Sequence, residues 1–275
     1  MTVEPFLAPA HDGRDRFGLW HPPAGRLRGL VLHLHPFAEE MNKSRRMAAL
    51  QARALAKCGW GVLQFDLLGC GDSAGDFGDA TWADWLADAC WAAQRLREHA
   101  HAPSAPLWLW GHRAGALLAV QAASRIADAE GRAPHLLLWQ PSGSGRLALQ
   151  QFLRLKVAGG ILAGDARGVT AALMRELADG RSVEVAGYRL HPAMAAGLDA
   201  ATLTPPPKPA RAVWLEVTSG DEFSLLPASR ATIERWRAVG WQLDAEVVQG
   251  AAFWQTAEIE DAPALIARTT QAVAR

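Results

Sequence analysis

The stretch PLWLWGHRAGALLAV, residues 106–120, decides the fold. Its first half is a run of apolar and aromatic residues that predicts a buried strand over 106–112. The residues that follow, 115–131, are rich in alanine and leucine and predict a helix. Gly111 and Gly115 flank the junction, as expected where a strand turns sharply into a helix that packs back against it. We therefore expect Arg113 to lie at the tip of a tight strand–turn–helix corner.

Outward from this corner, apolar strand patterns alternate with helical patterns. Strands are expected over 17–22, 29–36, 61–69, 135–141, 212–222 and 242–250, and helices over 42–59, 81–99, 227–240 and about 258–273. Asn42 or Ser44 is expected to cap the first of these helices, and Thr81 the second, with Asp84 in its first turn. Continuous apolar strands between helices predict a mostly parallel central sheet flanked by helices on both faces.

The segment 143–210 breaks this alternation. It has helical patterns but no strong strand, and it ends in the proline-rich stretch TLTPPPKPA, residues 202–210. We expect a single domain over 1–275, in which 143–210 forms a helical cap insertion. Such an insertion would lie over the carboxyl ends of the strands, where ligands of open α/β sheets bind.

The corner at residues 111–115 resembles the nucleophile elbow of α/β-hydrolases, in which the sequence is Gly-x-Ser-x-Gly. The resemblance and the order of elements together predict an α/β-hydrolase fold. Here the five residues are Gly111-His112-Arg113-Ala114-Gly115. A guanidinium offers no nucleophilic lone pair at ordinary pH, so Arg113 cannot replace the serine.

A literal Gly-x-Ser-x-Gly match occurs elsewhere, at residues 71–75, with Ser73 in the centre. It follows the strand expected over 61–69 and is succeeded by Asp-Phe-Gly-Asp instead of a helix. A motif outside its structural context is a weak signal. We therefore do not expect Ser73 to be a nucleophile.

Of the other two residues of a serine-hydrolase triad, the acid has a candidate in this sequence and the histidine has none. Asp221 stands at the end of the segment 212–222, where such enzymes carry the acid, although a Gly-Asp pair is also a common turn. Phe253 stands where the histidine would follow the last strand, and none of the nine histidines lies beyond His191. The order serine, aspartate, histidine cannot be completed, and Asp221 is at most a remnant acid.

The loop after the strand 29–36 is where α/β-hydrolases build their oxyanion hole. His35, Pro36 and Phe37 occupy it, and Glu39 and Glu40 follow. Lys43, Arg45 and Arg46 come soon after them. Together these charged residues form either the solvated start of a helix or a polar wall of the site.

Composition excludes several other classes of protein. The chain has 28 basic and 28 acidic residues and no basic tract, which argues against a nucleic-acid partner. It has no apolar run of the length that spans a membrane, and its N-terminus does not resemble a signal peptide. The three cysteines match no metal or redox motif, so we expect reduced thiols, a cytoplasmic location, and neither metal nor cofactor.

Four longer strings, HPFAEEMNKSRRM, DLLGCGDSAGDF, ATWADW and FWQTAEIEDAP, closely resemble the α/β-hydrolase-like proteins called "hydrolase 2, exosortase A system-associated". That resemblance implies a bacterial gene neighbourhood. It contains a system that sorts proteins carrying a C-terminal PEP-CTERM signal, together with exopolysaccharide synthesis genes. The resemblance implies a hydrolase fold and no particular substrate.

The leading hypothesis is a non-hydrolytic protein that binds an anionic acyl or sugar compound. Arg113 would lie at the N-terminus of a helix, where backbone amides already favour an anion. Alternatively, Arg113 pairs with Asp221 or Glu222 across the former triad gap. The residues expected to contact the ligand are Arg113, His112, His35, Phe37, Glu39, Glu40, Phe253 and Trp254.

Two further hypotheses remain open. In the first, the chain is an active ester or thioester hydrolase, with Glu39, Glu40, Asp221 or Glu222 as general base and Arg113 stabilising an oxyanion. In the second, it is a scaffold for a protein partner from the same gene neighbourhood, with the tryptophan-rich helix 81–99 as its surface. Exposure of Trp82, Trp85 and Trp91 would favour the scaffold, and their burial would count against it.

Overall fold

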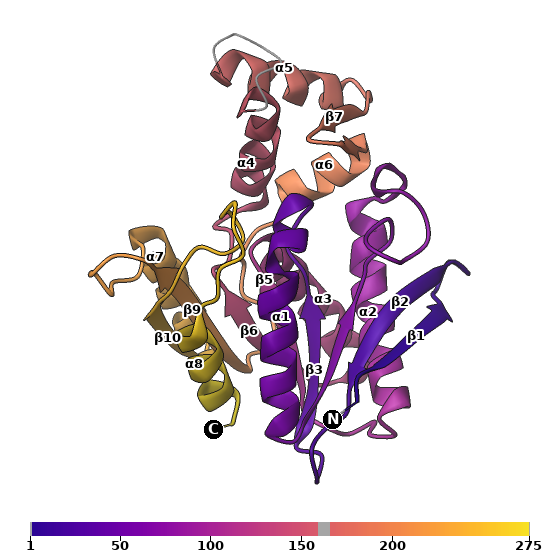
Figure 1. Ribbon diagram of the computed structural model, residues 1–275, viewed down its shortest axis with the longest axis vertical. Coiled ribbons are helices and arrows are strands. Elements are labelled where there is room, and N and C mark those ends of the chain that lie inside the picture. The colour runs from indigo at the N-terminus through magenta and orange to yellow at the C-terminus, as the bar shows by residue number, and fades with distance from the viewer. Residues whose placement is uncertain (1, 159–165, 275) are drawn as a thin grey trace.

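The computed structural model describes residues 2–158 and 166–274 and contains a central eight-stranded sheet between two layers of helices (Figure 1). Along the sheet the strands lie in the order β1 (Glu4–Pro9), β2 (Asp15–His21), β4 (Trp60–Phe65), β3 (Gly29–Leu34), β5 (Leu107–His112), β6 (His135–Trp139), β9 (Arg211–Thr218) and β10 (Gln242–Gln249). The six strands from β4 to β10 are parallel, and β1 and β2 form an antiparallel edge. The predicted α/β-hydrolase fold is confirmed.

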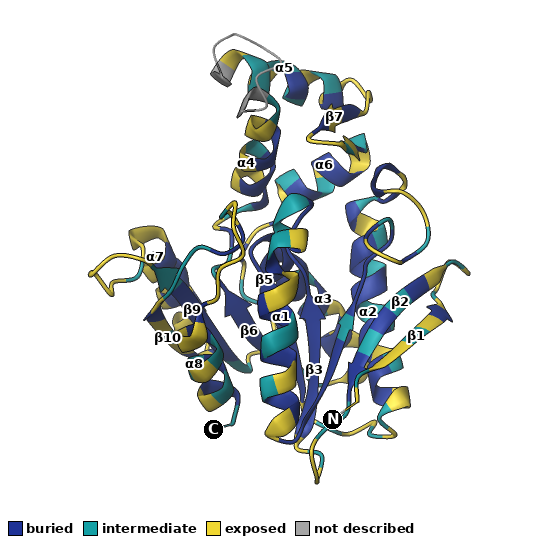
Figure 2. Ribbon diagram, in the orientation of Figure 1, coloured by how far each residue is buried: buried dark blue, intermediate teal, exposed yellow. Residues whose placement is uncertain are grey.

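Helices cover both faces of the sheet, as the continuous apolar strands predicted. One face packs against α1 (Glu39–Lys57) and α8 (Pro263–Ala274), and the other against α2 (Trp82–His99), α3 (Ala114–Glu130) and α7 (Pro227–Ala238). Figure 2 shows the central strands and the inner sides of these helices buried, whereas the edge strand β1 and the outer turns of the helices carry exposed residues. The sheet therefore separates two hydrophobic core clusters, one on each face.

Of the two helices for which the sequence predicts an N-cap, one begins as expected and one does not. Thr81 caps α2, and its side chain and that of Asp84 form a reciprocal capping box. The start of α1 differs, because the helix begins at Glu39 and is capped by neither Asn42 nor Ser44. Ala38 ends the preceding loop with φ 49° and ψ −124°, so the chain enters the helix earlier than the polar residues indicated.

The segment between β6 and β9 holds α4 (Gly145–Ala158), α5 (Ala166–Ala178), the short hairpin of β7 (Val183–Val185) and β8 (Tyr188–Leu190), and α6 (Pro192–Ala200). We call these elements the insert. They lie beyond the carboxyl ends of the parallel strands (Figure 1). Residues 159–165 of the predicted cap fall outside the described residues. The hairpin was not expected, because its strands have only three residues each.

The loop between β4 and α2 includes a single 3-10 turn, η1 (Phe77–Asp79). Phe77 packs edge-on against Phe37 and Tyr188, so this loop supports the insert from the side. Among the helices of the described residues, none is both long and apolar enough to cross a membrane.

Candidate functional site

Arg113 lies at the tip of the predicted corner between β5 and α3. Its backbone has φ 56° and ψ −119°, a conformation that L-residues rarely adopt. The turn is held by a hydrogen bond from the Arg113 amide to the Trp139 carbonyl, at 3.0 Å. A Cβ at Gly115 would lie 2.5 Å from the His35 carbonyl oxygen, so only glycine fits there. The backbone thus has the shape of a nucleophile elbow, with an arginine at its tip.

The Arg113 side chain is nearly buried and reaches three different elements. Its Nη2 lies 3.2 Å from Glu40 Oε1 on α1 and donates to Gln151 Oε1 on α4 at 2.8 Å. Its Nε also donates to the Glu40 carboxylate, and the guanidinium carbon lies 5.5 Å from the centre of the Trp254 ring. Arg113 therefore joins the core, the insert and the loop after β10.

The expected pairing of Arg113 with Asp221 or Glu222 is wrong. Both acids are exposed in the loop after β9, whereas Glu40 lies in the first turn of α1 beside the elbow. The loop that starts at His35 turns sharply at Ala38, and this turn brings Glu40 to the guanidinium. Glu40 is the counter-ion of Arg113.

Two acidic residues at the start of α1 take different roles. Burial raises the pKa of Glu40 above its ordinary value, although the charge of Arg113 and the hydrogen bonds from it oppose this shift. Glu39 accepts a hydrogen bond from the Tyr188 hydroxyl at 3.2 Å. Burial, together with the nearby Glu39 charge and the hydrogen bond to it, raises the pKa of Tyr188 to about 12. Glu39 therefore links α1 to the hairpin of the insert through a hydrogen bond, whereas Glu40 forms the ion pair with Arg113.

A cavity of about 300 Å³ lies between α1, α4 and the loop after β10. Its apolar wall is largely aromatic, and the side chain of Lys43 lies at its rim with Nζ 3.4 Å from the Gln255 carbonyl oxygen. Residues lining it include Phe37, Phe152, Leu155, Trp254, Ala114, Glu40 and Gln151. Of the residues predicted to contact a ligand, Phe37, Glu39, Glu40 and Trp254 line this cavity, and Arg113 pairs with Glu40 at its side.

Besides Arg113 and Asp221, three further residues predicted for the site lie outside the lining of this cavity. His112 is buried beneath the elbow, with its ring 5.3 Å from that of Phe253, and burial holds the pKa of His112 well below its ordinary value. Phe253 itself is 2% exposed and packs in the core. His35 Nδ1 bonds to the Pro36 carbonyl oxygen, 2.7 Å away. The first two side chains are buried in the core, whereas His35 lines a different cavity, on the other flank of α1.

Ser73, the centre of the misplaced motif, has a structural role. Its hydroxyl donates to the Asp66 carbonyl and accepts a hydrogen bond from the Phe17 amide at 2.9 Å. These bonds tie the loop after β4 to β2. The expectation that Ser73 is not a nucleophile agrees with this placement.

The tryptophans of α2 do not form an exposed surface. Trp82 and Trp85 are buried, and Trp91 is half-buried. The Nε1 atoms of the first two donate to Gln121 and to the Leu68 carbonyl. This burial counts against the scaffold hypothesis.

Sequence reasoning missed Gln151, Phe152 and Leu155 as site residues. They lie on α4, which comes from the insert, and only the fold brings this helix over the elbow. The helical pattern of residues 145–158 was the only available signal, and it does not specify which face meets the core.

Comparisons with known proteins agree with the geometry. The family model described as serine aminopeptidase, S33, matches residues 25–161. No curated protein matches the chain. The solved structure of Est1E from Butyrivibrio proteoclasticus with bound ferulic acid is similar, with a TM-score of 0.66 and 16% identity, over 98% of this chain and 97% of that one.

Two other solved structures have the same fold. A soluble variant of monoglyceride lipase from Saccharomyces cerevisiae, in complex with a substrate analogue, has a TM-score of 0.64 and 14% identity, over 100% of this chain and 94% of that chain. A carboxyl esterase from Bacillus coagulans, in complex with glycerol, has a TM-score of 0.58 and 15% identity, over 91% of each chain. The chain is an α/β-hydrolase-like protein in its fold.

Proposed function

We propose that this α/β-hydrolase-like chain is a non-hydrolytic binding protein for a small anionic acyl compound. The observation that carries the proposal is the position of Arg113. Its backbone stands at the elbow, where a nucleophile would be needed, and its guanidinium lies at the side of the aromatic cavity. Guanidinium is chemically inert toward an ester but binds a carboxylate in a bidentate manner.

The Glu40 carboxylate marks where a ligand carboxylate would sit. It takes hydrogen bonds from both Nε and Nη2 of Arg113, which is the geometry that a bound carboxylate would adopt. Its side chain is 24% exposed, so a ligand can approach the pair. Because burial raises the pKa of Glu40, this side chain takes up a proton more readily than an ordinary glutamate. We infer that the ligand anion replaces Glu40 beside Arg113.

The remaining contacts select the rest of the ligand. Phe37, Phe152 and Trp254 offer aromatic faces for an acyl or aromatic tail. Lys43 at the rim adds a second positive charge, and Ala114, the first residue of α3, lines the cavity at the positive end of that helix. The aromatic acid bound in the similar Est1E structure supports a ligand of this chemical class. The resemblance to exosortase-associated proteins supports a source in exopolysaccharide assembly, and a protein partner from that gene neighbourhood.

The test combines binding and turnover. Calorimetric titration with ferulate and with octanoate should give saturable binding to the wild-type chain. The double variant Arg113→Met, Glu40→Gln keeps the neutral balance of the site and should lose this binding. The exposed pair of Arg189 and Asp79 provides a control, since Arg189→Met should bind normally. Equal binding by the double variant and the wild type would refute the proposal.

The active-hydrolase alternative is favoured by one observation, the raised pKa of Glu40 at the cavity wall. Glu40 could accept a proton from water, and Arg113 could stabilise the oxyanion. Asp221 and Glu222 are exposed and do not line the cavity. Turnover of nitrophenyl esters or acyl thioesters that vanishes in Glu40→Gln would establish this alternative and overturn the binding proposal.

A further inference from the structure

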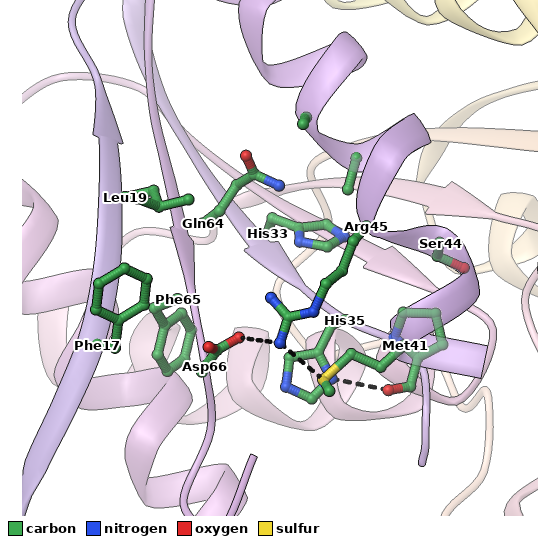
Figure 3. A pocket seen from close by; sticks show the side chains of 13 residues that line it. Phe17, Leu19, His33, His35, Met41, Ser44, Arg45, Gln64, Phe65 and Asp66 are labelled. Carbon is green, nitrogen blue, oxygen red and sulfur yellow. Dashed lines mark hydrogen bonds and ion pairs between the residues drawn. The ribbon is translucent and has the colours of Figure 1, made fainter. Parts of the chain in front are cut away.

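A second cavity, of about 210 Å³, lies on the other flank of α1, between that helix and strands β2, β3 and β4. Figure 3 shows Phe17 and Leu19 on one side of it, and Arg45 extending from α1 on the other. Glu40, Lys43 and Gln151 of the first cavity are absent from its lining. The two cavities have no lining residue in common, although α1 and the loop at residues 35–37 border both of them.

An unpartnered buried histidine forms part of this second cavity. His33 on β3 is 4% exposed, and its Nε2 atom has no hydrogen-bond partner within residues 2–158 and 166–274. His33 is paired across the sheet with Gln64, and Figure 3 shows the two side chains at the same wall. Burial lowers the pKa of His33 well below its ordinary value, so the ring is neutral and offers one donor and one acceptor. A buried polar atom without a partner is unusual in a folded protein.

Arg45 and Asp66 form the charged part of the cavity lining. Arg45 Nη2 donates to Asp66 Oδ1 at 3.1 Å, and Asp66 Oδ2 accepts from the Asp72 amide at 3.0 Å. In Figure 3 the guanidinium extends across the cavity toward Asp66. The hydrogen bonds of Arg45 to other described residues use Nη2, which leaves Nε and Nη1 as donors for a ligand oxygen. The Arg45 charge is balanced by Asp66, so the cavity has no surplus charge to recognise an ion.

We propose that this cavity is a second binding site, for an uncharged single-ring aromatic compound that carries a hydroxyl or carbonyl group. Phe17, Leu19 and Phe65 supply the apolar wall for the ring. His33 and Arg45 supply hydrogen bonds for the oxygen. An apolar cavity of about 150 Å³ in another protein is known to hold benzene, so this space suffices for one ring.

The experiment compares benzyl alcohol with toluene, by NMR titration of the full chain. Benzyl alcohol should bind saturably at millimolar concentration, and about tenfold more tightly than toluene, because only the alcohol can form hydrogen bonds with the buried His33 ring and with Arg45. His33→Leu should remove this difference and leave toluene binding in place. Arg45→Met should also reduce the difference in affinity between benzyl alcohol and toluene. This variant replaces His33→Leu in the experiment if His33→Leu fails to fold.

Matched blocking variants locate the site. Ala49 lines this cavity and is half-buried, whereas Ala148 lines the first cavity. Ala49→Phe should abolish benzyl alcohol binding, and Ala148→Phe should leave it unchanged. No saturable binding by the wild type, or the opposite response of these two variants, would overturn the proposal. Neither outcome depends on whether the first cavity binds an anion.

Discussion

The ion pair between Arg113 and Glu40 joins two turns that share one unusual backbone conformation. Arg113 has φ 56° and ψ −119°, and Ala38, two residues before Glu40, has φ 49° and ψ −124°. The 3.2 Å contact between Nη2 and Oε1 spans the gap between these turns. In an active enzyme of this fold the same gap holds the nucleophile and the oxyanion hole. Here a salt bridge fills it.

Removal of Arg113 alone should destabilise the chain. Arg113→Met leaves the Glu40 carboxylate without its counter-ion, and we expect the free energy of unfolding to fall by about 2 kcal/mol at pH 7. The double variant Arg113→Met, Glu40→Gln should recover at least about 1 kcal/mol of this loss. Urea unfolding of the wild type, both single variants and the double variant measures the coupling.

The exposed pair of Arg146 and Asp199 is the control for this experiment. The Arg146 side chain is 66% exposed, so Arg146→Met should change the unfolding free energy by less than about 0.5 kcal/mol. A loss for Arg113→Met no larger than that of the control would contradict the view that the Arg113–Glu40 pair is structurally coupled.

Anion binding at Arg113 should weaken as the pH rises. The pKa of Glu40 is raised by burial, and an anion that displaces this carboxylate favours its protonated form. Proton uptake on binding makes the affinity highest at low pH, with a decline as Glu40 loses its proton. Benzenesulfonate is a suitable probe, because it stays ionised throughout the range from pH 5 to pH 8.

The variant Glu40→Gln tests the origin of that pH dependence. It removes the competing carboxylate, so benzenesulfonate should bind more tightly at pH 8 than it does to the wild type. The affinity should also become nearly independent of pH. A wild-type affinity that is already flat between pH 5 and pH 8 would show that Glu40 does not compete with the ligand.

Two buried histidines should make the fold sensitive to acid. Burial lowers the pKa of His33 and of His112 well below 6.5, so both are neutral in the native state. Their stabilising contribution is complete above pH 6.5, where the unfolded chain is also neutral. It is lost as the pH falls, because only the unfolded chain then takes up protons.

The expected loss is up to about 1.4 kcal/mol per histidine for each pH unit below 6.5. Thermal unfolding between pH 7.5 and pH 5 measures it as a falling Tm. His112→Phe should make the decline shallower because it removes one of the two histidines. Phenylalanine should be tolerated there, since Phe253, Trp139 and Trp254 already surround this side chain with aromatic rings. An unchanged slope in this variant would exclude His112 as a source of the acid sensitivity.

Ala38→Gly should stabilise the chain. The positive φ of Ala38 costs a residue with a side chain about 1 kcal/mol or more, whereas glycine adopts it freely. Against this gain stands the greater entropy of glycine in the unfolded chain, so a net gain of about 0.5 kcal/mol is expected. Ala231→Gly, at an exposed position within α7, should instead cost about 1 kcal/mol. Chemical unfolding of both variants measures whether the free energy of unfolding rises for Ala38→Gly and falls for Ala231→Gly.

The fold was predictable because its signals are local. The elbow depends on Gly111 and Gly115, whose spacing is visible in the chain, and both are required by close backbone contacts. The capping box of Thr81 and Asp84 is another short-range pattern. By contrast, the antiparallel edge strand β1 was missed, since Glu4–Pro9 is mostly exposed and contains prolines at positions 5 and 9.

The site was predictable only in part. Phe37, Glu40, Arg113 and Trp254 follow strands that end at one edge of the sheet, so their meeting could be inferred from topology. Arg113 pairs with Glu40 and not with Asp221 because of the turn at Ala38, and the sequence Phe-Ala-Glu contains no residue typical of such a turn. The contribution of Gln151 depends on how α4 lies against α1, and no local pattern specifies that angle. The second cavity could not be predicted without knowing that His33 pairs with Gln64 across the sheet, and this register is not apparent from the sequence.

The elbow at residue 113 also gives one position control over the chemistry of the first cavity. The turn is fixed by glycines and by the amide of residue 113, none of which involves the side chain at that position. Residue 113 can therefore be exchanged while the surrounding backbone keeps its shape. A small library of substitutions there, combined with Glu40→Gln, would present acidic, neutral or thiol groups to the same aromatic wall. The chain is in that sense a ready-made scaffold for the design of new receptors.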